Sequence, residues 1–92
     1  MKIHYNIKIL GDVQGVFFRD FAKKFADELF IRGFVKNMPD HSVYIEAEGE
    51  EQNIKKFLER LKIGPQYGHV SEVETKEDKH KDFTDFEIIY SS

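Results

Sequence analysis

Residues 3–29, IHYNIKILGDVQGVFFRDFAKKFADEL, decide the fold because they join two different hydrophobic periods through a short glycine-containing loop. Over residues 3–10 apolar and polar side chains alternate, which is the period of a half-buried strand. From Phe18 to Leu29 apolar residues recur every three or four positions, which is the period of an amphipathic helix. The stretch therefore predicts a strand, a connecting loop and a helix.

The sequence after this stretch predicts a hairpin, a second helix and two more extended segments. The expected strands are residues 34–38, 43–48, 70–75 and 86–90. The expected helix carries Glu50 and Glu51 in its first turn, has its apolar stripe within residues 54–61 and ends near Lys62. Pro39-Asp40-His41-Ser42 separates the first two of these strands with residues typical of a turn, and Gly64-Pro65 ends the helix. The charged stretch 76–82, KEDKHKD, is expected to be a solvated loop.

The element order βαββαβ is that of the split-βαβ, ferredoxin-like arrangement. We therefore predict an α+β fold in which an antiparallel sheet carries both helices on one face and gains a short extra strand at its C-terminal end. The polar positions that alternate with the apolar ones in residues 3–10 and 43–48 would face water on the other side of the sheet. All 92 residues, 1–92, are expected to form one domain.

Composition and charge exclude several classes of function. The chain has 14 Lys and Arg against 17 Asp and Glu, a net charge of −3, so it has no overall electrostatic basis for binding nucleic acid or an anionic membrane. It has no cysteine, which excludes disulfides, thiolate zinc sites, iron–sulfur clusters and cysteine nucleophiles. Its apolar runs are too short for a membrane-spanning helix or a signal peptide. A cytoplasmic monomer without a cofactor is expected.

The four histidines give no indication of a metal site. His4, His41, His69 and His80 are scattered along the chain, and no two of them have the spacing of metal ligands. We therefore expect exposed or turn histidines and no bound metal.

The loop before the first helix carries the clearest indication of chemistry. Gly15 can adopt a positive φ, which would let the backbone N–H groups of Gly15, Val16, Phe17, Phe18 and Arg19 converge on one anion. The start of a helix also presents unpaired N–H groups and partial positive charge, and Arg19 adds a fork of donors that suits a phosphate. The alternative is an ordinary glycine turn with an arginine reaching solvent. The known nucleotide-binding glycine motifs are not present.

This loop resembles the first signature of the acylphosphatase family, a Gly, then Val-Gln-Gly-Val and an aromatic-flanked Arg, which GDVQGVFFRD at residues 11–20 matches in full. Gly33-Phe34-Val35-Lys36-Asn37 is similar to the second signature, and Val43 and Gly49 follow at the family's distances. His41 stands where the family has a turn glycine, so modest backbone strain is expected there. The resemblance continues to the last strand and spans nearly the whole chain.

The resemblance implies that Arg19 and Asn37 are the catalytic residues of a hydrolase that cleaves acyl phosphates into a carboxylate and inorganic phosphate without metal. Arg19 can neutralise charge on the phosphoryl oxygens, and the carboxamide of Asn37 can orient a water but is too weakly basic to deprotonate it. Taken alone, Asn37 is better explained as a polar residue that ends a strand, and only its place in the second signature reverses this. Phe17 could wall the substrate pocket, whereas Phe18 is expected in the core.

Two other functions are compatible with a fold of this class, because fold does not determine function. An RNA-recognition sheet is disfavoured, since VYIEAE at residues 43–48 is acidic where such a sheet needs a basic and aromatic strand. A non-catalytic module that binds phosphate or acyl phosphate remains as the alternative, because Arg19 and the loop amides would serve it equally well. In both remaining cases the expected partner is a small-molecule acyl phosphate or phosphate.

Overall fold

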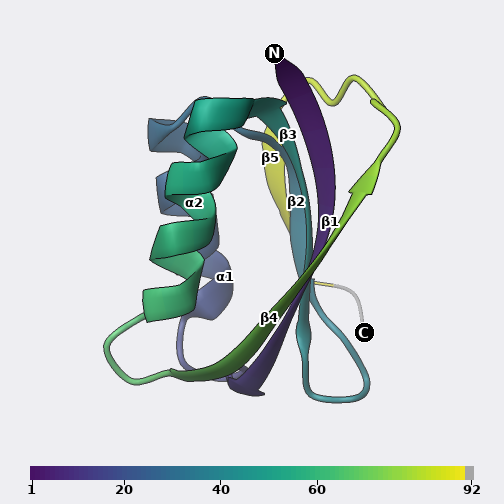
Figure 1. The fold of residues 1–92 in the computed structure, drawn as a ribbon. Coiled ribbons are helices and arrows are strands. Elements are labelled where there is room, and N and C mark those ends of the chain that lie inside the picture. Colours follow the sequence, from purple (N-terminus) through teal and green to yellow (C-terminus); the bar gives the residue numbers. More distant parts are fainter. Residues whose placement is uncertain (91–92) are drawn as a thin grey trace.

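Two helices cover one face of a five-stranded sheet in the computed structural model, which describes residues 1–90 (Figure 1). The elements are β1 (Lys2–Asp12), α1 (Phe18–Glu28), β2 (Arg32–Asn37), β3 (Val43–Glu50), α2 (Glu51–Ile63), β4 (His69–Asp78) and β5 (Phe86–Ile89). The strands lie in the order β4-β1-β3-β2-β5. The predicted ferredoxin-like α+β fold with an added C-terminal strand is confirmed.

The sheet is mixed: four strands form the predicted antiparallel arrangement, and the added C-terminal strand runs parallel to its neighbour. β1 pairs antiparallel with β3 and β4, and β2 pairs antiparallel with β3. β5 instead runs parallel to β2, from Gly33 opposite Phe86 to Lys36 opposite Ile89. β4 runs opposite to β1 and β2. The chain reverses direction after β4 and crosses to the opposite edge of the sheet, so β5 runs in the same direction as its neighbour β2.

The core lies between the sheet and the helices, as the two hydrophobic periods predict. Ile7 and Ile9 of β1 are fully buried against the helices. α1 buries Phe18, Ala22 and Ala26, and its two alanines let the helix lie close to the sheet. α2 buries Ile54, Phe57 and Leu61, and the ring of Phe57 contacts that of Phe86 on β5, with the centroids 6.1 Å apart. These contacts hold both helices against the sheet.

The turn between β2 and β3 has the backbone that the sequence predicts. His41 has φ 73°, in the left-handed region, and its N–H donates to the carbonyl of Met38 at 3.1 Å. The N–H of Met38 donates to the carbonyl of Ser42 at 2.9 Å, which closes the turn. Hydrogen bonds from Ser42 and Lys8 hold the pKa of the Asp40 carboxyl well below its usual range.

The face of the sheet away from the helices is not simply wet, and here the sequence-based expectation is wrong. His4, Glu46 and Glu48 point to this face, yet His4 is fully buried and the exposed fractions of Glu46 and Glu48 are only 6% and 1%. The expectation that His4 is an exposed or turn residue is likewise wrong. Its Nδ1 lies 3.1 Å from Oε2 of Glu48 and its Nε2 lies 3.0 Å from Oε1 of Glu46. We call His4, Glu46, Glu48 and Lys81 the His4 cluster.

The cluster is buried because the chain between β4 and β5 passes over it (Figure 1). The backbone N–H groups of Lys81 and Asp82 donate to Oε2 of Glu48 at 2.6 and 3.2 Å, and that of Phe83 donates to Oε1 at 3.0 Å. The side chain of Lys81 reaches Oε1 of Glu46 at 2.9 Å. The stretch 76–82 is therefore not a free solvated loop: residues 76–78 extend β4, and the following backbone is fastened to Glu48.

Candidate active site

Two residues of the loop between β1 and α1 have positive φ, as predicted for Gly15. Gly15 has φ 73°, and Phe17, the residue before the helix, has φ 63°. The first hydrogen bond of α1 runs from the N–H of Phe21 to the carbonyl of Phe17 at 3.0 Å. The N–H groups of Phe18, Arg19 and Asp20 precede this bond and have no carbonyl of the helix to bind. They are available to a ligand at the positive end of the helix.

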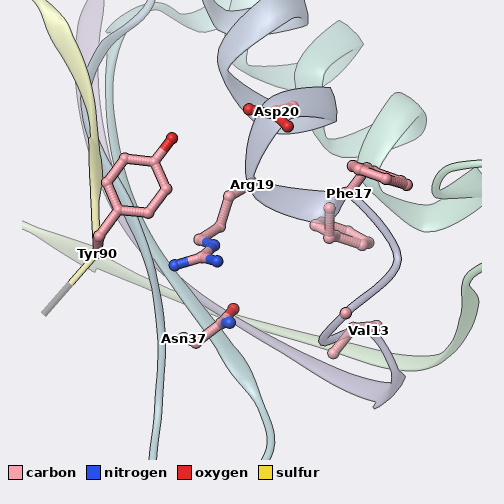
Figure 2. Close-up of a pocket in the computed structure, with 8 residues that line it drawn as sticks. Val13, Phe17, Arg19, Asp20, Asn37 and Tyr90 are labelled. Atoms are coloured by element: carbon pink, nitrogen blue, oxygen red, sulfur yellow. The ribbon is translucent and has the colours of Figure 1, made fainter. Parts of the chain in front are cut away.

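Arg19 and Asn37 line the same pocket, which has a volume of about 260 Å³. Arg19 comes from the first turn of α1 and Asn37 is the last residue of β2. In Figure 2 the guanidinium of Arg19 points down toward the carboxamide of Asn37. The two elements thus place a permanent cation and a neutral donor and acceptor on opposite sides of one small cavity.

Both side chains keep their hydrogen-bonding capacity for a ligand. Within residues 1–90, neither the guanidinium of Arg19 nor the carboxamide of Asn37 forms a hydrogen bond or an ion pair with another residue. Asp20, the adjacent carboxylate, lines the pocket but does not pair with Arg19. An anion that enters the pocket would therefore not have to displace a protein carboxylate from the guanidinium.

Tyr90 is a pocket residue that sequence reasoning missed. The guanidinium carbon of Arg19 lies 4.8 Å from the centroid of the Tyr90 ring, a cation–π contact. This contact restrains the guanidinium without occupying its N–H donors, which lie in the plane of the group. Figure 2 shows the Tyr90 ring beside Arg19. No local sequence signal could have found Tyr90, because it reaches the pocket through the long-range pairing of β5 with β2.

The other predicted site residues divide between the pocket and the core. Gly15 and Phe17 line the pocket, and the side chain of Phe17 is 73% exposed. Phe18 also lines it but is almost completely buried, as expected of a core residue. Val16 does not line the pocket, and its side chain packs against the core. Val13 and Asp20 also line the pocket, and their positions within residues 11–20, which match the first signature, were the only sequence signal for them.

Gln14 connects the loop to the turn that follows Asn37. Its side-chain Nε2 donates to the carbonyl of Met38 at 2.9 Å and to the carbonyl of Ser42 at 2.8 Å. The first of these acceptors belongs to the residue directly after Asn37. Gln14 is thus hydrogen-bonded across the gap between the two segments that supply the pocket.

Two other kinds of feature do not occur in the described residues. Residues 1–90 contain no group of three or more His, Asp or Glu side chains arranged to hold a metal ion. In the same part of the chain no helix is long and apolar enough to cross a membrane.

Comparison with known proteins identifies the family. The family model for acylphosphatases matches residues 5–88. The chain belongs to the acylphosphatase family. An acylphosphatase from Archaeoglobus fulgidus is 46% identical over 88 residues, which are 96% of this chain and 99% of that protein. An acylphosphatase from Clostridium acetobutylicum is 43% identical and covers 98% of this chain and 100% of its own length.

The structure agrees with the sequence comparison. The crystal structure of acylphosphatase from Bacillus subtilis superimposes with a TM-score of 0.94 at 36% identity, covering 96% of this chain and 99% of that one. The resemblance to acylphosphatases that the two signatures indicate is therefore confirmed, and so is the assignment of the chain to a family of hydrolases.

Proposed function

We propose that Arg19, Asn37 and the amides that follow Gly15 carry out the hydrolysis of acyl phosphates, the activity of the acylphosphatase family to which this chain belongs. The phosphoryl group would bind to the N–H groups of residues 15–19 and to the guanidinium of Arg19. These donors would neutralise the charge on the phosphoryl oxygens, which is the main requirement of phosphoryl transfer. The proposal is supported chiefly by the open hydrogen-bonding capacity of Arg19 and Asn37 on two sides of one pocket.

Asn37 is proposed to orient the attacking water. A carboxamide can accept one hydrogen bond from a water and donate another, so it can hold the water in line with the bond that breaks. It is too weakly basic to remove the proton, which would pass to an oxygen of the phosphoryl group itself. The water adds to phosphorus as the bond between phosphorus and the acyl oxygen breaks, which leaves a carboxylate and inorganic phosphate.

The leaving group explains why such a small site would be sufficient. A carboxylate leaves as the conjugate base of an acid whose pKa is roughly 4, so it needs no proton from a general acid. Arginine and loop amides can supply the charge compensation that a metal ion supplies in other phosphoryl-transfer sites. We therefore propose that the reaction is metal-independent. We also propose that the protein acts as a monomer in the cytoplasm, with the substrate as its only partner.

Hydrolysis of benzoyl phosphate, followed by its absorbance in the presence of a chelator, tests this function. We expect rapid hydrolysis by the parent protein and a loss of roughly a hundredfold in kcat for Asn37→Ala. The affinity of Asn37→Ala for inorganic phosphate should stay close to that of the parent, because Arg19 and the loop amides are unchanged. Phosphate binding by a parent protein that does not hydrolyse benzoyl phosphate would instead identify a non-catalytic binding module.

A further inference from the structure

The proposed reaction needs two separate segments of the chain to stay at a fixed distance from each other. The groups that would bind the phosphoryl group, Arg19 and the loop amides, belong to the segment 13–19. The group that would bind the water, Asn37, is at the end of β2. A displacement of about 1 Å between a bound substrate and the group that attacks it can cost roughly a hundredfold in rate. The contacts that join these two segments therefore bear directly on turnover.

Gln14 supplies the direct polar connection between them. Its Nε2 donates to Met38 at 2.9 Å and to Ser42 at 2.8 Å, so both N–H bonds of the amide are used. Within residues 1–90 no other hydrogen bond or ion pair joins 13–19 to 37–42. The exposed ion pair between Lys8 and Asp40, 3.0 Å long, reaches the same turn but starts from the middle of β1.

The turn does not depend on Gln14 for its own closure. The carbonyl of Met38 already accepts from the N–H of His41, and the carbonyl of Ser42 already accepts from the N–H of Met38. Gln14 therefore donates to the second lone pair of each carbonyl. What its amide adds is not the hairpin but the link from the hairpin to the phosphate-binding loop.

From this arrangement we propose that Gln14 is a positioning residue that sets the distance between the bound phosphoryl group and Asn37. The inference rests on the proposed function. It assigns to Gln14 an effect on turnover that is separate from substrate binding, because Gln14 lies on the same segment as the phosphate-binding groups. Without the link, the loop keeps its own donors while Asn37 is no longer held at the attacking distance.

Gln14→Glu is the sharpest variant, because glutamate has the same shape but its carboxylate has no N–H to donate. At pH 7 we expect its kcat for benzoyl phosphate to fall by about tenfold or more, and its inhibition constant for inorganic phosphate to stay within about twofold of the parent. Lowering the pH should recover part of the lost kcat relative to the parent, because the protonated carboxyl regains one donor. Gln14→Met, which has similar length and no ionisable group, should show the loss of kcat without this recovery.

Lys8→Met is the matched control. It removes the other polar contact of the same turn, an exposed ion pair of small energetic value, without touching the link to the loop. We expect its kcat and phosphate inhibition to match those of the parent. A loss of kcat in Lys8→Met as large as that in Gln14→Met would overturn the inference, because general loosening of the turn would then explain both.

Two further results would also overturn it. Unchanged kcat in Gln14→Met would show that the link does not position Asn37. A parallel loss of kcat and phosphate affinity would show that Gln14 maintains the loop itself. Both differ from failure of the proposed function, in which the parent protein would not hydrolyse benzoyl phosphate. If Gln14→Glu fails to fold, as judged by circular dichroism, the uncharged Gln14→Met tests the inference instead. The same two constants are measured, kcat for benzoyl phosphate and the inhibition constant for inorganic phosphate.

Discussion

The candidate active site and the His4 cluster are two polar regions of one small protein. They differ in whether their side chains have polar partners within the protein. In the His4 cluster, both ring nitrogens of His4 contact carboxylates, and Glu48 also accepts three backbone N–H groups. In the pocket, the side chains of Arg19 and Asn37 have no polar partner within residues 1–90. The difference supports the proposal that the first region stabilises the chain and that the second binds a ligand.

The largest expected effect is that of Arg19→Ala. Removing the guanidinium takes away both phosphate binding and compensation of charge in the transition state, so we expect kcat/KM for benzoyl phosphate to fall by roughly a thousandfold or more. The free energy of unfolding should change by no more than about 1 kcal/mol, because the cation–π contact with Tyr90 is lost but no ion pair is broken. Arg32→Ala, at an exposed arginine outside the pocket, is the matched control. Unchanged phosphate affinity in Arg19→Ala, measured by inhibition, would contradict the role of Arg19.

The second effect concerns stability, and it tests the role of the His4 cluster. Burial by itself would raise the pKa of Glu48, but the N–H groups of residues 81–83 and the ring of His4 outweigh it and lower the pKa from 4.5 to about 2. The stabilisation from Glu48 is therefore present above about pH 4.5 and is lost as the pH falls toward 2. We expect Glu48 alone to account for about 3 kcal/mol of this acid destabilisation.

Chemical denaturation followed by circular dichroism at a series of pH values measures this effect. Glu48→Gln should be less stable than the parent at pH 7 and should lose less of its remaining stability between pH 4.5 and 2. Its kcat per folded molecule should be that of the parent, since the His4 cluster lies on the face of the sheet away from the helices. An acid dependence identical to that of the parent would show that Glu48 is not the group responsible.

A smaller effect is expected at Tyr90, whose ring lies beside the guanidinium of Arg19. Tyr90→Leu removes the cation–π contact but keeps an apolar side chain, so phosphate affinity should fall by about threefold to fivefold, corresponding to 0.5–1 kcal/mol. Tyr90→Phe keeps the ring and should bind phosphate as the parent does. Phe30→Leu, at an exposed aromatic residue beyond the other end of α1, is the control. Equal losses in the Leu and Phe variants of Tyr90 would exclude the ring as the cause.

The smallest effect is expected at the turn beside the pocket. His41 has φ 73°, a conformation that costs energy for a residue with a Cβ atom. His41→Gly should relieve this cost and, after the greater entropy of an unfolded glycine is subtracted, stabilise the protein by about 0.5 kcal/mol. The midpoint of thermal unfolding measures this change. A lower midpoint for His41→Gly would show that the turn is not strained.

The order of the elements and the local shape of the site could be predicted from the sequence. Period-2 and period-3.6 patterns are local, and they placed β1, α1 and the hairpin with small errors at the ends. The positive φ values of Gly15 and His41 also follow from local residue types and from the family resemblance. The pairing of the two signatures in one pocket follows from the fold, because β2 and the start of α1 meet at the same end of the sheet.

What could not be predicted depends on contacts between distant residues. Alternation in β1 and β3 shows which side chains share a face, but it does not show whether another segment covers that face. The sequence therefore predicted His4 as exposed, whereas the backbone of residues 81–83 covers its neighbour Glu48. Tyr90 was missed for the same physical reason, because the parallel pairing of β5 with β2 leaves no local pattern.

The crossing from β4 to β5 has a consequence for the order in which the protein is completed during synthesis. A nascent chain that has left the ribosome as far as β3 already contains Arg19, Gln14 and Asn37. The ring that contacts the Arg19 guanidinium is still absent, because Tyr90 follows β5, the strand that is made last and that pairs with β2. The contact between the Tyr90 ring and the Arg19 guanidinium can therefore form only after β5 has been made.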